Sequence, residues 1–248
     1  CLFINMKFTA AVVLVACLAV ANAELINHGI RKIENSRAPL QFNFCGLCDS
    51  FVSQGINQLL NAILNIGVVG SCGQLCQKAF PSSSTEAGIC NLLCDGVGIY
   101  GFIHLLDKFG KDIDPIFFCE ELKACPVHDG GKANIDKMTV TPPSGPQGTT
   151  FEIDVFFTVT NQTSTGEMVF DVQPPKDMPF GDGELDTGFA PGQYAVKFSL
   201  TAEPQESESF EPGNYKFEFT LCDGQCGAPY PHTALLSQKA GNFTITGH

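Results

Sequence analysis

Four cysteine motifs decide how the first half of this chain folds: CGLC at residues 45–48, CGQLC at 72–76, CNLLC at 90–94 and CEELKAC at 119–125. In the two central motifs the outer cysteines stand four residues apart, which is about one turn of an α-helix. Apolar residues between the motifs recur at steps of three and four, as one face of a helix requires. The stretch from Cys45 to Cys125 therefore predicts several helices joined by disulfides.

The pairing of these cysteines follows from how the helices meet. A short turn between two antiparallel helices brings the turn-proximal Cys76 and Cys90 together, and the next pair outward then also meets. The same nesting ties the first helix to the last. Each bridge needs a Cα separation of about 5.5 Å. The predicted pairs are Cys45–Cys125, Cys48–Cys119, Cys72–Cys94 and Cys76–Cys90.

Four helices are expected in this stretch. The first is long and carries its apolar residues on one broad face. A turn at residues 81–84 breaks the pattern before the third helix, and Pro115 suits the first turn of the fourth, where its missing N–H costs nothing. The expected extents are residues 47–64, a short segment around 72–76, residues 86–106 after a cap at Ser84 or Thr85, and a last helix that starts at Asp112 or Asp114.

After Cys125 the period of the pattern changes from near 3.6 residues to two. Apolar side chains alternate along residues 151–159, as in a half-buried strand. Turns rich in Pro and Gly separate this segment from others like it. Strands are expected at residues 138–140, 151–159, 168–172, 194–200, 215–221 and 243–246. This number of short strands in the last half of the chain is typical of a β-sandwich, of which the immunoglobulin-like type is one candidate.

The N-terminal residues are interpreted as targeting sequence. Residues 1–5 precede the first methionine and read as translated leader, and residues 6–23 have the apolar run and Ala-Asn-Ala end of a secretory signal peptide. That run is shorter than the ~20 residues that cross a bilayer, and no later segment is expected to cross one. The expected organisation thereafter is an extension at 24–43, a helical domain at 44–126, a linker at 127–134 and a β domain at 135–248.

Secretion gives the remaining cysteines and two sequons a meaning. Ten cysteines remain after residue 23, and in an oxidising compartment an even set predicts disulfides, which adds a Cys222–Cys226 bridge. Asn161 and Asn242 each begin an Asn-x-Thr triplet and are expected to be glycosylated. The formal net charge of −12 argues against a nucleic-acid partner, because phosphate binding needs clustered Lys and Arg.

The cysteine spacing resembles that of the saposin B-type domain. The C-x2-C start at Cys45 and the C-x5-C end at Cys125 match that family, whereas the second central pair departs from its six-cysteine pattern. Nearly the whole mature chain is also similar to the countin family of secreted amoebal proteins, through the eight cysteines, TVTPPSGPQGT at residues 139–149 and CDGQC at 222–226. The expected fold therefore has two domains: an all-α saposin-like, disulfide-linked module, as the resemblance implies, followed by the all-β sandwich that the strand pattern predicts. That sandwich is either immunoglobulin-like or similar to small secreted lipid-recognition sandwiches.

The resemblances imply two functions. A countin-like chain would be a secreted signalling or interaction protein that acts with protein partners in an extracellular complex limiting the size of a cell aggregate. The alternative is a lipid-binding or membrane-perturbing saposin-like effector of acidic compartments, whose acidic helical half would favour membranes only at low pH. An apolar helical face is more often closed core than lipid surface. Candidate lipid-facing residues are Phe51, Ile56, Leu59, Ile63, Leu93, Val97, Tyr100 and Ile103.

No arrangement of residues typical of catalysis is found in the sequence. There is no nucleophile elbow, H-E-x-x-H motif or glycine-rich phosphate loop. CGLC at 45–48 lacks the βαβ context of a redox pair, and no histidine stands at zinc-ligand spacing from it. His104, among apolar residues of the third helix, is either a pH sensor or an ordinary core-edge residue. We expect a protein that is not an enzyme and needs no metal or cofactor.

Overall fold

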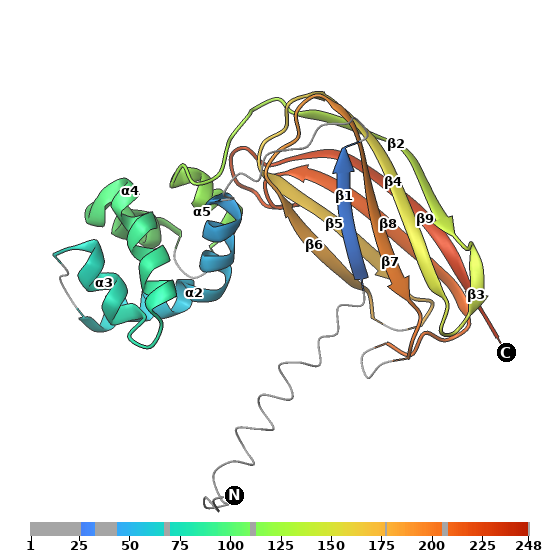
Figure 1. The fold of residues 1–248 in the computed structure, drawn as a ribbon, viewed down its shortest axis with the longest axis horizontal. Helices are drawn as coiled ribbons and strands as arrows, with labels where there is room; N and C mark the ends of the chain where they lie inside the picture. Colours follow the sequence, from blue (N-terminus) through green and yellow to red (C-terminus); the bar gives the residue numbers. More distant parts are fainter. Residues whose placement is uncertain are drawn as a thin grey trace, which may run out of the picture.

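The computed structural model describes residues 26–32, 44–66, 70–109, 113–176, 178–204 and 208–247. Within these residues the chain forms four helices, gathered in one group, and nine strands in two facing sheets (Figure 1). We call residues 44–125 the helical unit and the nine strands with their loops the β unit. The expected leader and signal peptide, residues 1–23, lie outside the described residues.

The helices are α2 (Phe44–Ile66), α3 (Cys72–Ala79), α4 (Ser84–Phe109) and α5 (Pro115–Glu121). Polar side chains cap three of them by accepting a hydrogen bond from an N–H of the first turn. The Ser71 hydroxyl caps α3 at 3.3 Å and the Asp114 carboxylate caps α5 at 3.0 Å. At α4 the expected cap at Ser84 or Thr85 is wrong, because the Ser83 hydroxyl accepts from the Glu86 N–H at 3.3 Å.

α4 is longer and more apolar than the sequence pattern suggested. Its best 18-residue window has a mean hydropathy of 1.6, so by length and composition it is long enough to cross a membrane, contrary to our expectation for segments after Ala23. It is not one straight rod, however. Gly98 interrupts the helix with a φ of 75°, which a residue with a Cβ rarely adopts. Bridges to α3 from Cys90 and Cys94 hold its first half against that helix.

Five disulfides join the same cysteine pairs that the sequence predicted. Cys45–Cys125 and Cys48–Cys119 connect α2 with α5 and the residues after it. Cys72–Cys94 and Cys76–Cys90 connect α3 with α4, and Cys222–Cys226 closes a loop of the β unit. The eight cysteines of the helical unit are all buried, together with Leu59, Leu75 and Phe102. Disulfides thus form part of the core of this small unit, as expected where apolar burial alone is limited.

The nine strands form two sheets, ordered β1-β7-β4-β2 and β3-β9-β8-β5-β6. Neighbours are antiparallel except β3 and β9, which run parallel. The strands are β1 (Ile26–Lys32), β2 (Lys132–Thr141), β3 (Ser144–Pro146), β4 (Thr150–Asn161), β5 (Gly166–Gln173), β6 (Phe180–Asp186), β7 (Gly192–Thr201), β8 (Gly213–Asp223) and β9 (Ala234–Thr246).

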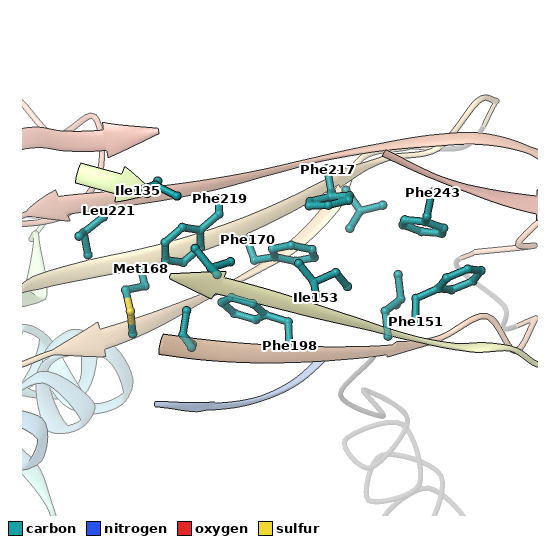
Figure 2. Packing of buried hydrophobic residues seen from close by; sticks show 14 of the residues in the cluster. Ile135, Phe151, Ile153, Met168, Phe170, Phe198, Phe217, Phe219, Leu221 and Phe243 are labelled. Carbon is teal, nitrogen blue, oxygen red and sulfur yellow. The ribbon is translucent and has the colours of Figure 1, made fainter. Parts of the chain in front are cut away.

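The two sheets enclose one apolar core rich in phenylalanine. On β4 the side chains of Phe151, Ile153, Val155 and Phe157 are buried, whereas the residues between them are exposed or half-buried. This alternation is the one expected for strands that cover a core on one face only. Figure 2 shows rings from β4, β5, β7, β8 and β9 converging between the sheets; Phe170 stacks on Phe198 with centroids 4.7 Å apart.

The expected fold class, an all-α saposin-like module followed by an all-β immunoglobulin-like sandwich, is contradicted. The described chain is a mixed α and β structure in which no separate all-α saposin module is evident. β1 lies before the helices in sequence but pairs with β7 along Ile26–Leu200 to Lys32–Tyr194. Residues expected as an irregular extension therefore complete a sheet of the β unit. The helices are an insertion between strands of one sheet, since backbone pairing is not restricted to neighbours in sequence.

Candidate functional site

The helical unit meets the β unit through an aromatic contact. Phe117 of α5 stacks on Tyr230, which lies in the loop between β8 and β9, with ring centroids 4.9 Å apart and an interplanar angle of 21°. Phe109 contacts both rings edge-on, at 5.3 Å and 6.2 Å. The Lys108 ammonium lies 5.2 Å and 5.6 Å from the centroids of Phe109 and Phe117. Such contacts contribute about 0.5–1.5 kcal/mol each beyond area burial.

Hydrogen bonds also link the β unit to the residue that follows the helical unit. The carbonyl of Pro126, which directly follows the last disulfide of the helical unit, accepts bonds from the N–H and the hydroxyl of Thr165 at 3.0 Å and 2.9 Å. The Thr165 carbonyl in turn accepts from the Gly224 N–H at 2.9 Å. Thr163, Ser164 and Thr165 are almost fully buried, so each polar group there needs a partner. We call this contact region, from Pro126 to the 223–232 loop, the junction.

Glu120 of α5 is the most perturbed carboxyl on the helical side of the junction. It is 6% exposed, and burial raises its pKa to about 7; Asp114 and Asp223 add to the rise, while His232 and the Ser164 hydroxyl oppose it. The Ser164 hydroxyl lies 3.5 Å from Glu120 Oε1. The Ser164 N–H donates to Asp223 Oδ1 at 2.8 Å. Ser164 therefore separates two carboxylates that belong to different units.

A second group of carboxylates lies around a cleft of about 250 Å³ between α2, α5, β6 and the 222–226 loop. Asp49 and Glu167 line it, and Asp114 is buried close by. Burial raises the pKa of all three, and Asp114 also raises the pKa of the other two. Glu167 Oε2 accepts from the Cys226 N–H at 3.0 Å, and Asp114 Oδ2 has no hydrogen-bond partner among the residues that the structure describes. The cleft is therefore strongly negative when its carboxylates are ionised.

Asp186, at the end of β6, is a further buried carboxyl, and it lies inside the β unit. It is 5% exposed, and burial raises its pKa to about 8, with Asp223 and Glu184 adding to the rise. The Gly188 N–H donates to Asp186 Oδ1 at 2.9 Å and opposes the shift. A buried carboxyl with raised pKa is kept neutral by its surroundings at mildly acidic pH.

These residues suit proton binding better than metal or redox chemistry. Among the described residues, no three His, Cys, Asp or Glu side chains are placed to hold a metal ion. Cys45 and Cys48 of the CGLC motif are each bonded to a distant cysteine rather than to one another, so they do not form a redox pair. His104 is exposed on α4.

The predicted lipid-facing residues divide by burial. Phe51, Ile56, Leu59 and Leu93 are buried in the core of the helical unit and do not face solvent. Ile63, Val97 and Ile103 are half-buried, and Tyr100 is 86% exposed. Two leucines that we had not singled out as lipid-facing, Leu64 and Leu92, are also exposed. The apolar residues available to a partner are therefore mostly different from those the helical period suggested.

A groove of about 670 Å³ lies between α3 and α4. Its lining includes the apolar residues Phe80, Pro81 and Ala87 and the polar residues Gln77 and Asn91. On the β unit, the sequon residues Asn161 and Asn242 are both exposed. The Asn161 side chain donates to the Gly130 carbonyl at 3.3 Å, next to the chain that connects the two units.

The sequence pattern does not predict the junction. Its small polar run, Thr163 to Thr165, has the composition of an exposed turn, and Glu120 follows a cysteine on an otherwise ordinary helix. One signal was available. The chain carries 8 acidic and 4 basic residues from Phe44 to Pro126. After Pro126 it carries 16 acidic and 6 basic residues. Such a chain has too few cations to pair each carboxylate that folding brings together.

Comparisons with known proteins cover both units. Residues 43–123 match the family model described as the Countin N-terminal domain, and residues 133–248 match the Countin C-terminal domain. Countin-3 of Dictyostelium discoideum is 42% identical over 201 residues, which is 81% of this chain and 89% of the relative. Countin-1 of the same organism is 39% identical over 213 residues, 86% and 81% of the two chains.

Solved structures give a weaker likeness. The C-terminal domain of wzt aligns with a TM-score of 0.36 and 12% identity, covering 49% of this chain and 80% of that one. That likeness is too low to inform function. The two matching family models are both countin domains, and neither is a saposin domain.

Proposed function

The chain belongs to the countin family, and we propose that it is secreted and acts with protein partners in an extracellular complex that limits the size of a cell aggregate. The observation that carries this proposal is the family match, which extends over both the helical unit and the β unit. The ten cysteines after residue 23, all bonded in pairs, suit an oxidising extracellular environment. Residues 6–23 would direct export and be removed.

Native mass spectrometry of the secreted, non-reduced protein tests this proposal. We expect a chain that starts at Glu24, has ten oxidised cysteines, carries glycans at Asn161 and Asn242, and is bound to other polypeptides. The same material, added to aggregating amoebal cells, should reduce aggregate size, and heat-denatured material should not. Retention of the protein inside cells, or a monomer with no effect on aggregate size, would contradict the proposal. The single variants Asn161→Gln and Asn242→Gln should each lose one glycan, which would show that both asparagines are glycosylated.

A second function, lipid contact, is favoured by the exposed apolar residues of α4. Leu92 is 52% and Tyr100 86% exposed, although a large side chain gains about 1.5–3 kcal/mol on full burial. A membrane surface would cover these residues, and neutralisation of the carboxylates in acid would reduce repulsion from anionic lipid. This contact would use the outer surface of a closed helical unit rather than its core.

Liposome co-sedimentation measures this contact. With vesicles that contain anionic lipid, we expect binding at pH 4.5 and much weaker binding at pH 7.4. The double variant Leu92→Asp, Tyr100→Asp should bind about tenfold more weakly, since most of the buried apolar area is lost. Leu235→Asp, a leucine that is 62% exposed on the β unit, is the matched control and should bind as the parent does. Absence of binding at both pH values would rule out lipid contact.

A further inference from the structure

Carboxylates of the helical unit face carboxylates of the β unit across the junction. On the helical side are Asp49, Asp114 and Glu120, and on the other side are Glu167 and Asp223. Glu167 acts electrostatically on Asp49, and Asp223 acts on Glu120. Glu120 is 6%, Asp114 5% and Asp223 3% exposed, so water screens them poorly. Like charges brought together at a contact oppose that contact when both are ionised.

We propose that the junction is closed by protons: acidification holds the helical unit against the β unit, and neutral to alkaline conditions loosen this contact. Two opposing sets of interactions act at the junction. The Phe117–Tyr230 stack and the Thr165–Pro126 hydrogen bonds hold the units together at any pH in the physiological range. The facing carboxylates oppose them only when ionised. The connecting segment turns at Gly130, whose φ of 82° favours glycine.

The charged groups around the junction reinforce this direction. Glu120 faces His232, Asp114 and Asp223, and Asp223 also faces Asp129, His128 and Asp186. Asp49 faces Asp114 and Glu167, and Glu167 faces Asp171 as well. The Asp129 side chain bonds His232 at 2.7 Å, and Glu121 and Glu120 also face that ring. Among the charged side chains that act on these carboxyls, His232 lowers the pKa of Glu120 and His128 lowers the pKa of Asp223.

The sign of the pH effect follows from the pKa directions. Burial raises the pKa of Glu120 from 4.5 to about 7 and raises the pKa of Asp49, Asp114, Glu167 and Asp223. A carboxyl whose pKa rises on closure takes up a proton when the junction closes, so closure weakens as pH rises between the two values. Asp129 raises the pKa of His232, whose favourable charge is also lost as pH rises. Both effects therefore loosen the junction as pH rises, and for Glu120 this happens between pH 4.5 and about 7.

Hydrogen exchange at the Thr165 amide measures junction opening directly, because this N–H is bonded to Pro126 across the contact. Exchange detects even rare opening, and protection factors remove the pH dependence of intrinsic exchange. In the full secreted chain we expect the protection factor of Thr165 to fall about tenfold or more from pH 5.5 to pH 8.0. Amides in the centre of β8 should keep their protection, since they bond within one sheet.

The variant Glu120→Gln tests the mechanism, because glutamine keeps the shape and cannot ionise. Between pH 5.5 and pH 8.0 the Thr165 protection factor of this variant should fall several-fold less than that of the parent. The fall that remains is due to Asp223 and the other carboxylates. Glu203→Gln, an exposed glutamate of the β unit, should retain the full fall. Tyr230→Ala is the positive control for junction opening: it should lower the protection factor of the Thr165 amide at both pH values. Equal protection of the parent at both pH values, or an undiminished fall in Glu120→Gln, would overturn the proposal.

Discussion

The helical unit is expected to unfold when both disulfides that join α2 to the end of α5 are removed. Cys45–Cys125 closes a ring of 80 residues and Cys48–Cys119 one of 71, so each bridge greatly restricts the unfolded chain. The loss of chain entropy in the unfolded state gives Cys45–Cys125 about 4 kcal/mol of stabilisation. Cys48–Cys119 contributes about 3 kcal/mol, because it closes only short additional loops within a ring that is already closed. A loss of about 7 kcal/mol is comparable to the whole stability of a small domain.

Urea unfolding of the four-alanine variant, followed by circular dichroism at 222 nm, measures this loss. The variant with only Cys48 and Cys119 replaced should lose about 3 kcal/mol and remain helical, because Cys45–Cys125 still closes the ring. Replacement of Cys222 and Cys226, only four residues apart, should leave the helical signal unchanged. A four-alanine variant with the parental midpoint would show that apolar packing and the two bridges between α3 and α4 suffice to hold these helices.

The β unit is expected to lose about 3–5 kcal/mol when Phe170 is replaced by alanine, which is the usual cost of removing a fully buried ring. Phe170 has no exposed surface; its ring lies 4.7 Å from that of Phe198 and 5.5 Å from that of Phe217 (Figure 2). Its removal leaves a cavity between the two sheets that neighbouring rings fill poorly.

Phe156→Ala is the matched control for this substitution. Phe156 lies on β4, where the alternation of side chains directs it away from the core that holds Val155 and Phe157, and it is half-buried. Its replacement should cost about 1 kcal/mol or less. Urea unfolding followed by near-ultraviolet circular dichroism reports both variants. Equal losses for the two would mean that Phe170 does not lie in the core as the structure has it.

The sequence predicted much of the secondary structure, because the signals involved are local. The periodicity near 3.6 located α2 and α4, and strict alternation located β4, β7 and β8. The spacing of the cysteines gave the disulfide pairs, since helical turns bring them together in a fixed order. β1, β3 and β6 were missed. β6 has the sequence FGDGELD, whose glycines and acids are depleted in strands, and pairing with β5 outweighs that low propensity.

The sequence by itself thus determined most of the helical and extended segments, which cysteines pair, and to which family the chain is similar. Only the tertiary structure decided that β1, which precedes the helices in sequence, pairs with β7, which follows them. It also decided that most of the residues expected to face lipid are at least partly buried, and that carboxylates of the two units meet at Ser164. The reason is physical. Periodicity and spacing act over a few residues, whereas burial and charge proximity depend on segments that are distant in the chain until it folds.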